Sequence, residues 1–193
     1  MKRVCVFCGS SMGLNPTYQL AAQSMGKVLA QQDIELVYGG GNVGLMGEIA
    51  DATISYGGKV IGVIPEALIA KEIAHTGLTK LHVVSSMHER KALMSELSDA
   101  FIALPGGYGT FEEFCEMLTW TQLGLQQKPC GLLNIEGYYD HLIALFDRAV
   151  SEQFLRKENR LLVLEEQDPL RLLALLTSYQ PIVVDKWIER KES

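Results

Sequence analysis

The amino-acid sequence predicts an α/β fold: a doubly wound, Rossmann-like parallel sheet with helices on both faces, in a single domain. Short apolar runs alternate with longer amphipathic stretches, and strands that are apolar on both faces must be covered on both sides. No composition break, internal repeat or low-complexity tract divides the 193 residues, a length that suits one domain. Glycine-rich loops follow several of the predicted strands, at the edge where this architecture binds its ligands.

Seven segments have the composition of buried strands. In chain order they are 3–8, 34–38, 59–64, 81–85, 99–104, 130–135 and 161–164. Six further segments have helical periodicity: 17–32, 45–56, 87–97, 111–123, 139–152 and 169–178. The least regular segment, 65–79, is expected to form a flap or a short helix. We assign residues 1–185 to the nucleotide-binding domain that the motifs below suggest, and 186–193 to a charged C-terminal tail.

The composition excludes several classes of partner. A hydrophobic content of 48% and a charged content of 21% are ordinary for a soluble globular protein. The net charge of −6 argues against nucleic-acid or acidic-membrane binding. The first apolar run is too short for a signal peptide, and no stretch approaches the roughly 18 apolar residues of a membrane span. We therefore expect a cytoplasmic protein without nucleic-acid or membrane partners.

The cysteines and histidines do not form a recognisable metal or redox motif. Cys5 and Cys8 form a C-x-x-C, but their odd separation on a strand directs the two thiols to opposite faces. Cys115, Cys130 and the four histidines lack metal-ligand spacing. We expect ordinary buried thiols and no metal site.

Two of the glycine-rich loops follow the first two strands. The first loop, 8–13, is small enough to let a ligand approach the backbone. In the second, Gly39, Gly41 and Gly44 match G-x-G-x-x-G. That match keeps an NAD(P)-dependent oxidoreductase among the alternatives. However, the loop follows the second strand rather than the first, and the next strand does not end in an acidic residue.

The third loop, Leu104-Pro-Gly-Gly-Tyr-Gly-Thr110, links a strand to a helix and is suited to binding an anion. Glu112 and Glu113 follow it, where a bound phosphate would repel them. Thr110 and Glu113 have the spacing of a capping box. On local sequence alone, a helix cap and a catalytic carboxylate are equally open interpretations of Glu113.

A second predicted helix carries cations at its unfavourable end. Ser86 and Glu89 form a capping box, so Arg90 and Lys91 lie near the N-terminus, where the helix dipole disfavours positive charge. Two solvated side chains would explain this arrangement, and so would an anion bound between the two helices.

These motifs together resemble the LOG (Lonely guy) family. Met87-His-Glu-Arg-Lys91 and Pro105-Gly-Gly-Tyr-Gly-Thr-Phe-Glu-Glu113 are similar to its patterns M-x-x-R-K and P-G-G-x-G-T-x-x-E. The segments 38–47 and 119–124, with Lys128-Pro129, support the resemblance, which runs from about Val4 to Leu164.

The resemblance implies a phosphoribohydrolase that cleaves the N-glycosidic bond of nucleoside 5′-monophosphates, notably cytokinin riboside monophosphates and also AMP, to the free base and ribose 5-phosphate. It also implies a homodimer with the site near the interface, and a reaction that needs no cofactor. The matching catalytic residues are Arg90 and Glu113. The matching substrate-binding residues are Glu72, Lys91, Gly106, Gly107, Tyr108, Gly109, Thr110 and Thr119.

Three alternatives remain beside this interpretation. One is a non-catalytic protein that binds a phosphorylated cofactor or nucleotide, as molybdenum-cofactor carriers do. Another is the oxidoreductase named above, and the third is an interaction subunit with a vestigial site. The label of possible lysine decarboxylase that the family often carries has no support here, because no lysine lies in a recognisable pyridoxal-phosphate context.

Overall fold

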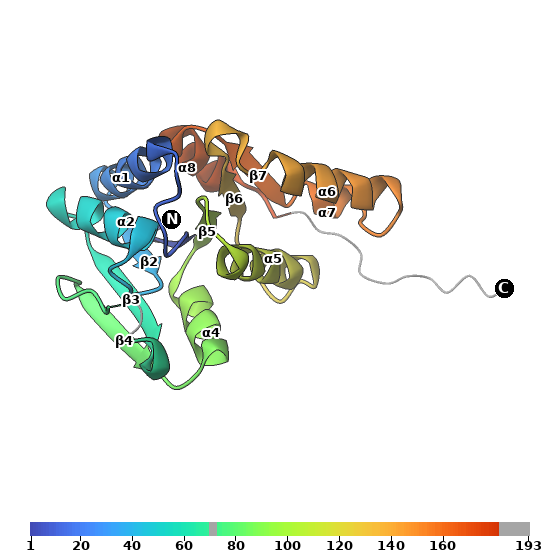
Figure 1. Ribbon diagram of the computed structural model, residues 1–193. Coiled ribbons are helices and arrows are strands. Elements are labelled where there is room, and N and C mark those ends of the chain that lie inside the picture. Colours follow the sequence, from blue (N-terminus) through green and yellow to red (C-terminus); the bar gives the residue numbers. More distant parts are fainter. Residues whose placement is uncertain (70–72, 182–193) are drawn as a thin grey trace.

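A computed structural model describes residues 1–69 and 73–181 (Figure 1). The predicted ligand residue Glu72 and the predicted tail, 186–193, lie outside the described residues. Of the irregular segment 65–79, the described part includes a short 3₁₀ helix, η1 (Glu66–Leu68).

All seven predicted strands are present, in one sheet in which every neighbouring pair is parallel. The strands are β1 (Arg3–Phe7), β2 (Glu35–Tyr38), β3 (Val60–Pro65), β4 (Lys80–Val84), β5 (Ala100–Ala103), β6 (Cys130–Leu133) and β7 (Val163–Glu166). Their order across the sheet is β4-β3-β2-β1-β5-β6-β7. The chain therefore builds outward from β1 in one direction and then in the other, as a doubly wound sheet does.

The six predicted helices are also present, and a short seventh was not predicted. They are α1 (Pro16–Gln31), α2 (Gly44–Ser55), α4 (Met87–Leu97), α5 (Tyr108–Gln122), α6 (Asp140–Ser151), α7 (Lys157–Arg160) and α8 (Pro169–Ser178), with a 3₁₀ turn η2 (Ile135–Gly137). The unpredicted helix, α7, has only four residues, too few to show a helical period.

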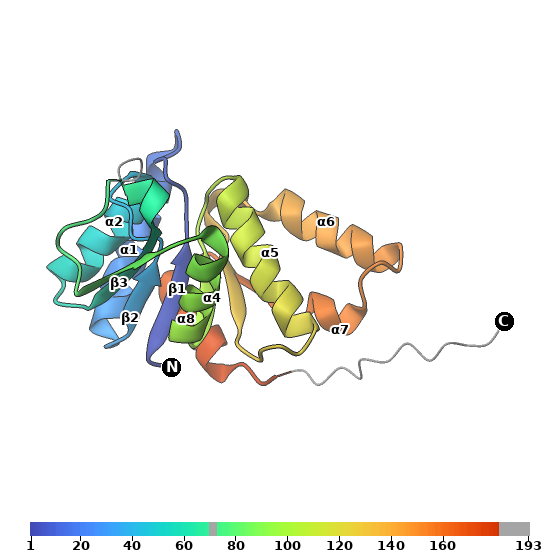
Figure 2. The same cartoon turned by 90° about the horizontal axis from the view of Figure 1, so that it is seen from below.

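Helices cover both faces of the sheet, as predicted. The apolar residues of α1, α2 and α8 form one core, and those of α4, α5 and α6 pack on the other. Figures 1 and 2 show these two groups with the sheet between them. Cys8 lies in the first core and Cys5 in the second, which confirms that the C-x-x-C thiols face opposite ways. Both are free thiols.

The chain changes direction at β1 and β5, and the loops after these two strands meet at the carboxyl edge of the sheet. The Gly9 N–H donates to the Pro105 carbonyl at 3.0 Å. The Gly9 carbonyl in turn accepts from the N–H of Leu45, at the start of α2, at 3.0 Å. Three loops are thus held together at the switch point, where this architecture binds ligands.

Candidate active site

Arg90 of α4 and Glu113 of α5 form a buried ion pair. The side chains are 7% and 10% exposed, and Nη2 of Arg90 lies 3.7 Å from Oε1 of Glu113. Removing two charges from water costs free energy that their attraction often only balances, so such a pair is a weak device for stability. Buried charges at the carboxyl edge of the sheet are instead typical of a site that acts on a ligand.

The N-terminal cap of α4 explains how Arg90 comes to lie in this buried position. Ser86 is the N-cap, and its hydroxyl accepts from the Glu89 N–H at 3.2 Å, as the predicted capping box requires. The Glu89 carboxylate, however, accepts from the N–H and hydroxyl of Ser85, at 2.8 and 2.7 Å, and these hydrogen bonds lower its pKa. The cap thus fixes the first turn of α4, and the buried Arg90 follows directly after Glu89.

Gly39, the first residue after β2, makes room for Arg90. A Cβ at Gly39 would overlap Nη2 of Arg90 and would lie 3.3 Å from its Cζ and 3.1 Å from the sulfur of Met46. Gly44, in the same loop, has φ +55°, and a Cβ there would overlap the backbone of Ser10. Contacts within the protein therefore account for two glycines of the G-x-G-x-x-G match.

The start of α5 differs from the prediction. The helix begins at Tyr108 with Gly107 as its extended N-cap (φ −100°, ψ −155°), so Thr110 is its third residue and Glu113 lies in the second turn. The predicted capping box of Thr110 and Glu113 is wrong, because glycine takes the cap position. No acidic residue lies in the first turn. Of the two open interpretations of Glu113, the helix cap is thereby removed.

The glycine-rich loop before α5 presents backbone N–H donors near the ion pair of Arg90 and Glu113. The first N–H groups of any α-helix lack intrahelical acceptors, and they carry the positive end of the helix dipole. Thr110 is buried, and its hydroxyl lies so close to Gly106 that a Cβ on that glycine would overlap it. No Cβ at Gly107 or Gly109 would meet an atom within 4 Å, so this side of the loop is open.

Lys91 points to acidic residues of α5. Its Nζ lies 2.5 Å from Oε1 of Glu112 and 3.1 Å from Oε2 of Glu116, and its side chain is 11% exposed. Burial alone would lower the pKa of Lys91, but the hydrogen bonds that its ammonium donates to these two carboxylates raise it above its ordinary value. The pairing gives Glu112 a structural role, as half of a link between α4 and α5.

Two predicted ligand residues lie on the outer surface of α5. Tyr108 is 92% exposed, and Thr119 is exposed with its hydroxyl donating to the Cys115 carbonyl at 2.8 Å. Thr119 lies six residues after Glu113, which is about 9 Å along the helix axis and on a different face. The structure therefore brings Arg90 and Glu113 together, while the side chains of Tyr108 and Thr119 are exposed.

A cavity of about 290 Å³ lies at the switch point between the first and third glycine-rich loops, where ligand access was predicted, but sequence reasoning missed the contribution of Tyr18, Leu45 and Tyr138. It is lined by residues 9–13 and 105–107 with Tyr18, Leu45 and Tyr138. Tyr138 comes from the turn between η2 and α6. Two adjacent tyrosines directly after a strand end were the only signal that this turn reaches the site.

The described residues hold no evident metal site and no membrane-spanning helix. Within 1–69 and 73–181, no three His, Cys, Asp or Glu side chains are grouped so that they could hold a metal ion. Among the helices of that same part of the chain, none combines the length and the apolar character needed to cross a bilayer.

The fold and the site define a class: a Rossmann-like α/β protein with a candidate anion site and a buried arginine–glutamate pair at its switch point. The model of the family described as possible lysine decarboxylase matches residues 46–176. The probable cytokinin riboside 5′-monophosphate phosphoribohydrolase LOGL9 of Oryza sativa subsp. japonica is 50% identical over 181 residues, 94% of this chain and 80% of that protein. The cytokinin riboside 5′-monophosphate phosphoribohydrolase LOG7 of Arabidopsis thaliana is 48% identical over 180 residues, 93% of this chain and 83% of that protein. The chain belongs to this LOG family, which confirms the resemblance seen in the sequence.

Solved structures with the same fold include molybdenum-cofactor proteins. The molybdenum cofactor binding protein from Rippkaea orientalis has a TM-score of 0.68 at 22% identity, over 92% of this chain and 97% of its own. The carrier protein from Chlamydomonas reinhardtii has a TM-score of 0.66 at 19% identity, over 91% and 96%. At these identities the likeness concerns the fold alone.

Proposed function

We propose that this protein hydrolyses the N-glycosidic bond of cytokinin nucleoside 5′-monophosphates, and of AMP, to give the free base and ribose 5-phosphate. The relatives that share about half of its residues are named for this reaction. The observation that carries the proposal is the buried pair of Arg90 and Glu113 beside the open N-terminus of α5.

The 5′-phosphate is assigned to the N–H groups of residues 107–110 and to the Thr110 hydroxyl. Several convergent N–H donors and the helix dipole favour an anion at this position. Lys91 is engaged by Glu112 and Glu116, so its part is to offset the negative charge of these carboxylates near the anion site and to link the two helices.

Glu113 is assigned to the ribose. Breaking the bond from C1′ to the base nitrogen builds positive charge on the sugar, as in glycoside hydrolysis. Glu113 stabilises this charge and takes a proton from the attacking water, whose oxygen bonds to C1′. The bonding electron pair leaves with the base nitrogen, which gains a proton from solvent.

Arg90 is assigned to holding Glu113 ionised and oriented. A cation at 3.7 Å favours the charged form of a buried carboxylate, against the effect of burial. The guanidinium also adds to the positive field that attracts the phosphate. The substitution Gly39→Ala tests whether the reaction depends on the position of this guanidinium.

We also propose a homodimer. The side chains of Tyr108 and Thr119 are exposed, and Thr119 lies on a different face of α5 from Glu113, so we assign the ligand contact of the Thr119 side chain to the site of a second copy. The region around the end of α5 and along α6 exposes Leu125 (71%), Leu145 (61%) and Leu123 (49%), which a second copy would cover. Light scattering coupled to size-exclusion chromatography tests this, and a mass of one chain of 21.4 kDa would contradict it.

We place the protein in the cytoplasm, since its free thiols suit a reducing compartment.

The activity is tested by product analysis. Purified protein is incubated with AMP and, separately, with N6-isopentenyladenosine monophosphate, and the free base is measured by liquid chromatography. The Glu113→Gln variant runs in parallel after circular dichroism has shown that it is folded. We expect the base from the wild type and a rate about 10²–10⁴ lower from the variant, the usual effect of losing a catalytic acid or base.

Two other outcomes would change the assignment. If the wild type binds AMP but releases no base, the protein is a nucleotide or cofactor binder. If Glu113→Gln turns over at the wild-type rate, Glu113 is not catalytic. The ratio of the two wild-type rates gives the preferred base.

A further inference from the structure

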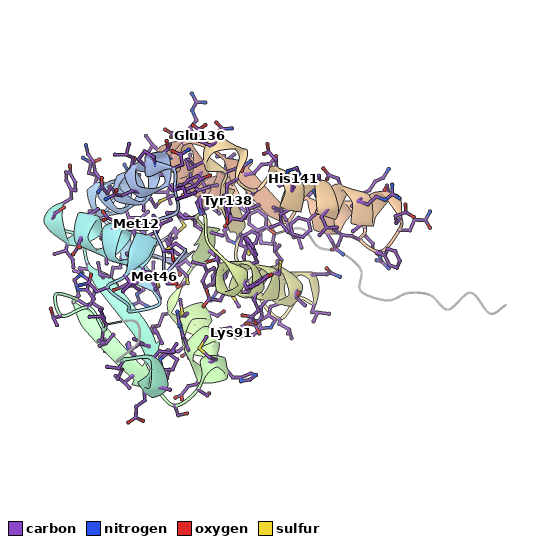
Figure 3. The ribbon with its side chains drawn as sticks, viewed as in Figure 1. Met12, Met46, Lys91, Glu136, Tyr138 and His141 are labelled. Atoms are coloured by element: carbon purple, nitrogen blue, oxygen red, sulfur yellow. The ribbon has the colours of Figure 1, made fainter. Side chains whose placement is uncertain are left out.

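Two adjacent tyrosines hold the glycine loop that precedes α5. The hydroxyl of Tyr138 donates to the Gly106 carbonyl at 2.5 Å, and that of Tyr139 donates to the Leu104 carbonyl at 2.6 Å. Tyr138, labelled in Figure 3, lies on the opposite side of α5 from Lys91 in that view. Both tyrosines precede α6, more than thirty residues beyond the loop they contact.

The turn that carries the tyrosines is itself fixed. Asn134 accepts from the Tyr139 N–H at 2.7 Å and donates to Asp140 at 2.8 Å. The Tyr138 ring packs edge-on against Tyr18, with ring centroids 5.6 Å apart, and against Tyr139 at 5.1 Å. A donor held in this way fixes the position of whatever it binds.

The hydrogen bond of Tyr138 determines where a neighbouring N–H points. In a trans peptide, the C=O and the N–H of one peptide plane point in opposite directions, and the described residues contain no cis peptide. The Gly106 carbonyl shares its plane with the Gly107 N–H. With the carbonyl turned to Tyr138, the Gly107 N–H is turned away from that tyrosine.

A peptide between two glycines needs such a restraint. Glycine has wide conformational freedom, so the plane between Gly106 and Gly107 could rotate at little cost. On the next plane toward the N-terminus, the Pro105 carbonyl is held by the Gly9 N–H at 3.0 Å. A donor contributes most to anion binding when it is oriented before the ligand arrives.

We propose that Tyr138 is a positioning residue that fixes the Gly106–Gly107 peptide so that the Gly107 N–H faces the phosphate of a nucleoside 5′-monophosphate. This inference rests on the proposed function for the identity of the ligand. Tyr139 serves as the comparison. The Leu104 carbonyl that it binds shares its peptide plane with the nitrogen of Pro105, which carries no hydrogen, so fixing this plane orients no donor. Removing either hydroxyl costs a hydrogen bond, but only Tyr138 controls a donor.

The experiment compares Tyr138→Phe with Tyr139→Phe. Each variant loses one hydroxyl bonded to a carbonyl of the same loop, and each keeps its ring. Binding of AMP, ribose 5-phosphate and adenine is measured by calorimetry, the AMP titrations being done in the Glu113→Gln background to prevent turnover. We expect Tyr138→Phe to weaken AMP and ribose 5-phosphate about tenfold, the scale of one charge-assisted hydrogen bond, and to leave adenine unchanged. Tyr139→Phe should lower the melting temperature and leave all three affinities near wild type.

The outcomes separate the positioning role from the proposed function. Equal losses of ribose 5-phosphate affinity in both variants, or none in Tyr138→Phe, would overturn the positioning role even in an active hydrolase. A selective loss in Tyr138→Phe would support it even if the wild type released no base, because binding is measured directly. Tyr138→Leu, which also lacks the hydroxyl, serves as the second variant if Tyr138→Phe does not fold, and the same phosphate-selective loss is expected.

Discussion

Replacing Gly39 by alanine should misplace Arg90 without removing any charged group. Gly39 is buried, and the new methyl carbon would overlap Nη2 of Arg90 while lying 3.3 Å from its Cζ. Carbon and nitrogen atoms that are not bonded prefer separations of roughly 3.5 Å or more. The guanidinium must therefore retreat by about 1 Å or more, since the β2 backbone is held in the sheet by its neighbours.

The expected effect is large on activity and small on stability. A displacement of about 1 Å in a catalytic constellation can reduce the rate about 10²-fold. Overpacking a well-packed interior costs about 1–3 kcal/mol, which in a chain of this size lowers the melting temperature by only a few degrees per kcal/mol. Gly39→Ala should thus release base from AMP about 10²-fold more slowly than the wild type, in a protein that remains folded at the assay temperature.

Gly131→Ala is the matched control. Gly131 lies in β6, and a Cβ there would lie 2.9 Å from Cδ1 of Leu172, a milder overpacking against the end of a side chain of α8. Both variants are compared by steady-state kinetics with AMP and by thermal melting. If Gly39→Ala keeps wild-type activity, or if Gly131→Ala loses as much, the proposed dependence of the reaction on the position of Arg90 is refuted.

Two further predictions concern groups outside the site. Burial alone would raise the pKa of Asp99, but the N–H groups of Lys2 and Arg3, at 2.5 and 3.0 Å, hold it below its ordinary value. The stabilisation that follows is present above the unfolded-state pKa of about 3.9 and is lost as the pH falls through the folded-state value. Asp99→Asn should therefore melt below the wild type at pH 7, with a gap that closes toward pH 3, and a gap independent of pH would contradict this. Burial also raises the pKa of the Cys130 thiol to about 12 and raises those of Cys5, Cys8 and Cys115 as well, but of the four only Cys115 is half-buried rather than buried. A thiol reagent should react with one cysteine in the native protein and with four after denaturation, and a second fast native thiol would contradict the assignment.

The sequence predicted the sheet well because its central strands are almost wholly apolar. In the central strands β1 and β5, nearly every residue is buried, and such runs flanked by glycine or polar residues leave little choice of structure. The helix start at Tyr108 was placed three residues too late. Thr110 and Glu113 match a cap by residue type, whereas the extended backbone that makes Gly107 the actual cap is not visible in a sequence.

The meeting of Arg90 with Glu113 was beyond local reasoning. Arg90 follows β4 at the edge of the sheet, whereas Glu113 follows β5, with three strands between them in the sheet. They come together because α4 runs back from the edge and packs across β3, β2 and β1. Local reasoning offered an anion bound between the two helices as one explanation of Arg90 and Lys91, but only the family resemblance paired Arg90 with Glu113 in advance. Nothing in the sequence around Lys91 indicated that its ammonium group would form ion pairs with Glu112 and Glu116.

The contact between Gly39 and Arg90 has an evolutionary consequence. The side chain allowed at one position is set by a residue 51 positions later in the chain, so the two sites should not diverge independently. A lineage that had abandoned the reaction and replaced the arginine would no longer need glycine after β2, and substitutions there would become neutral. Joint loss of both residues would therefore mark descendants that keep this fold but no longer perform its chemistry.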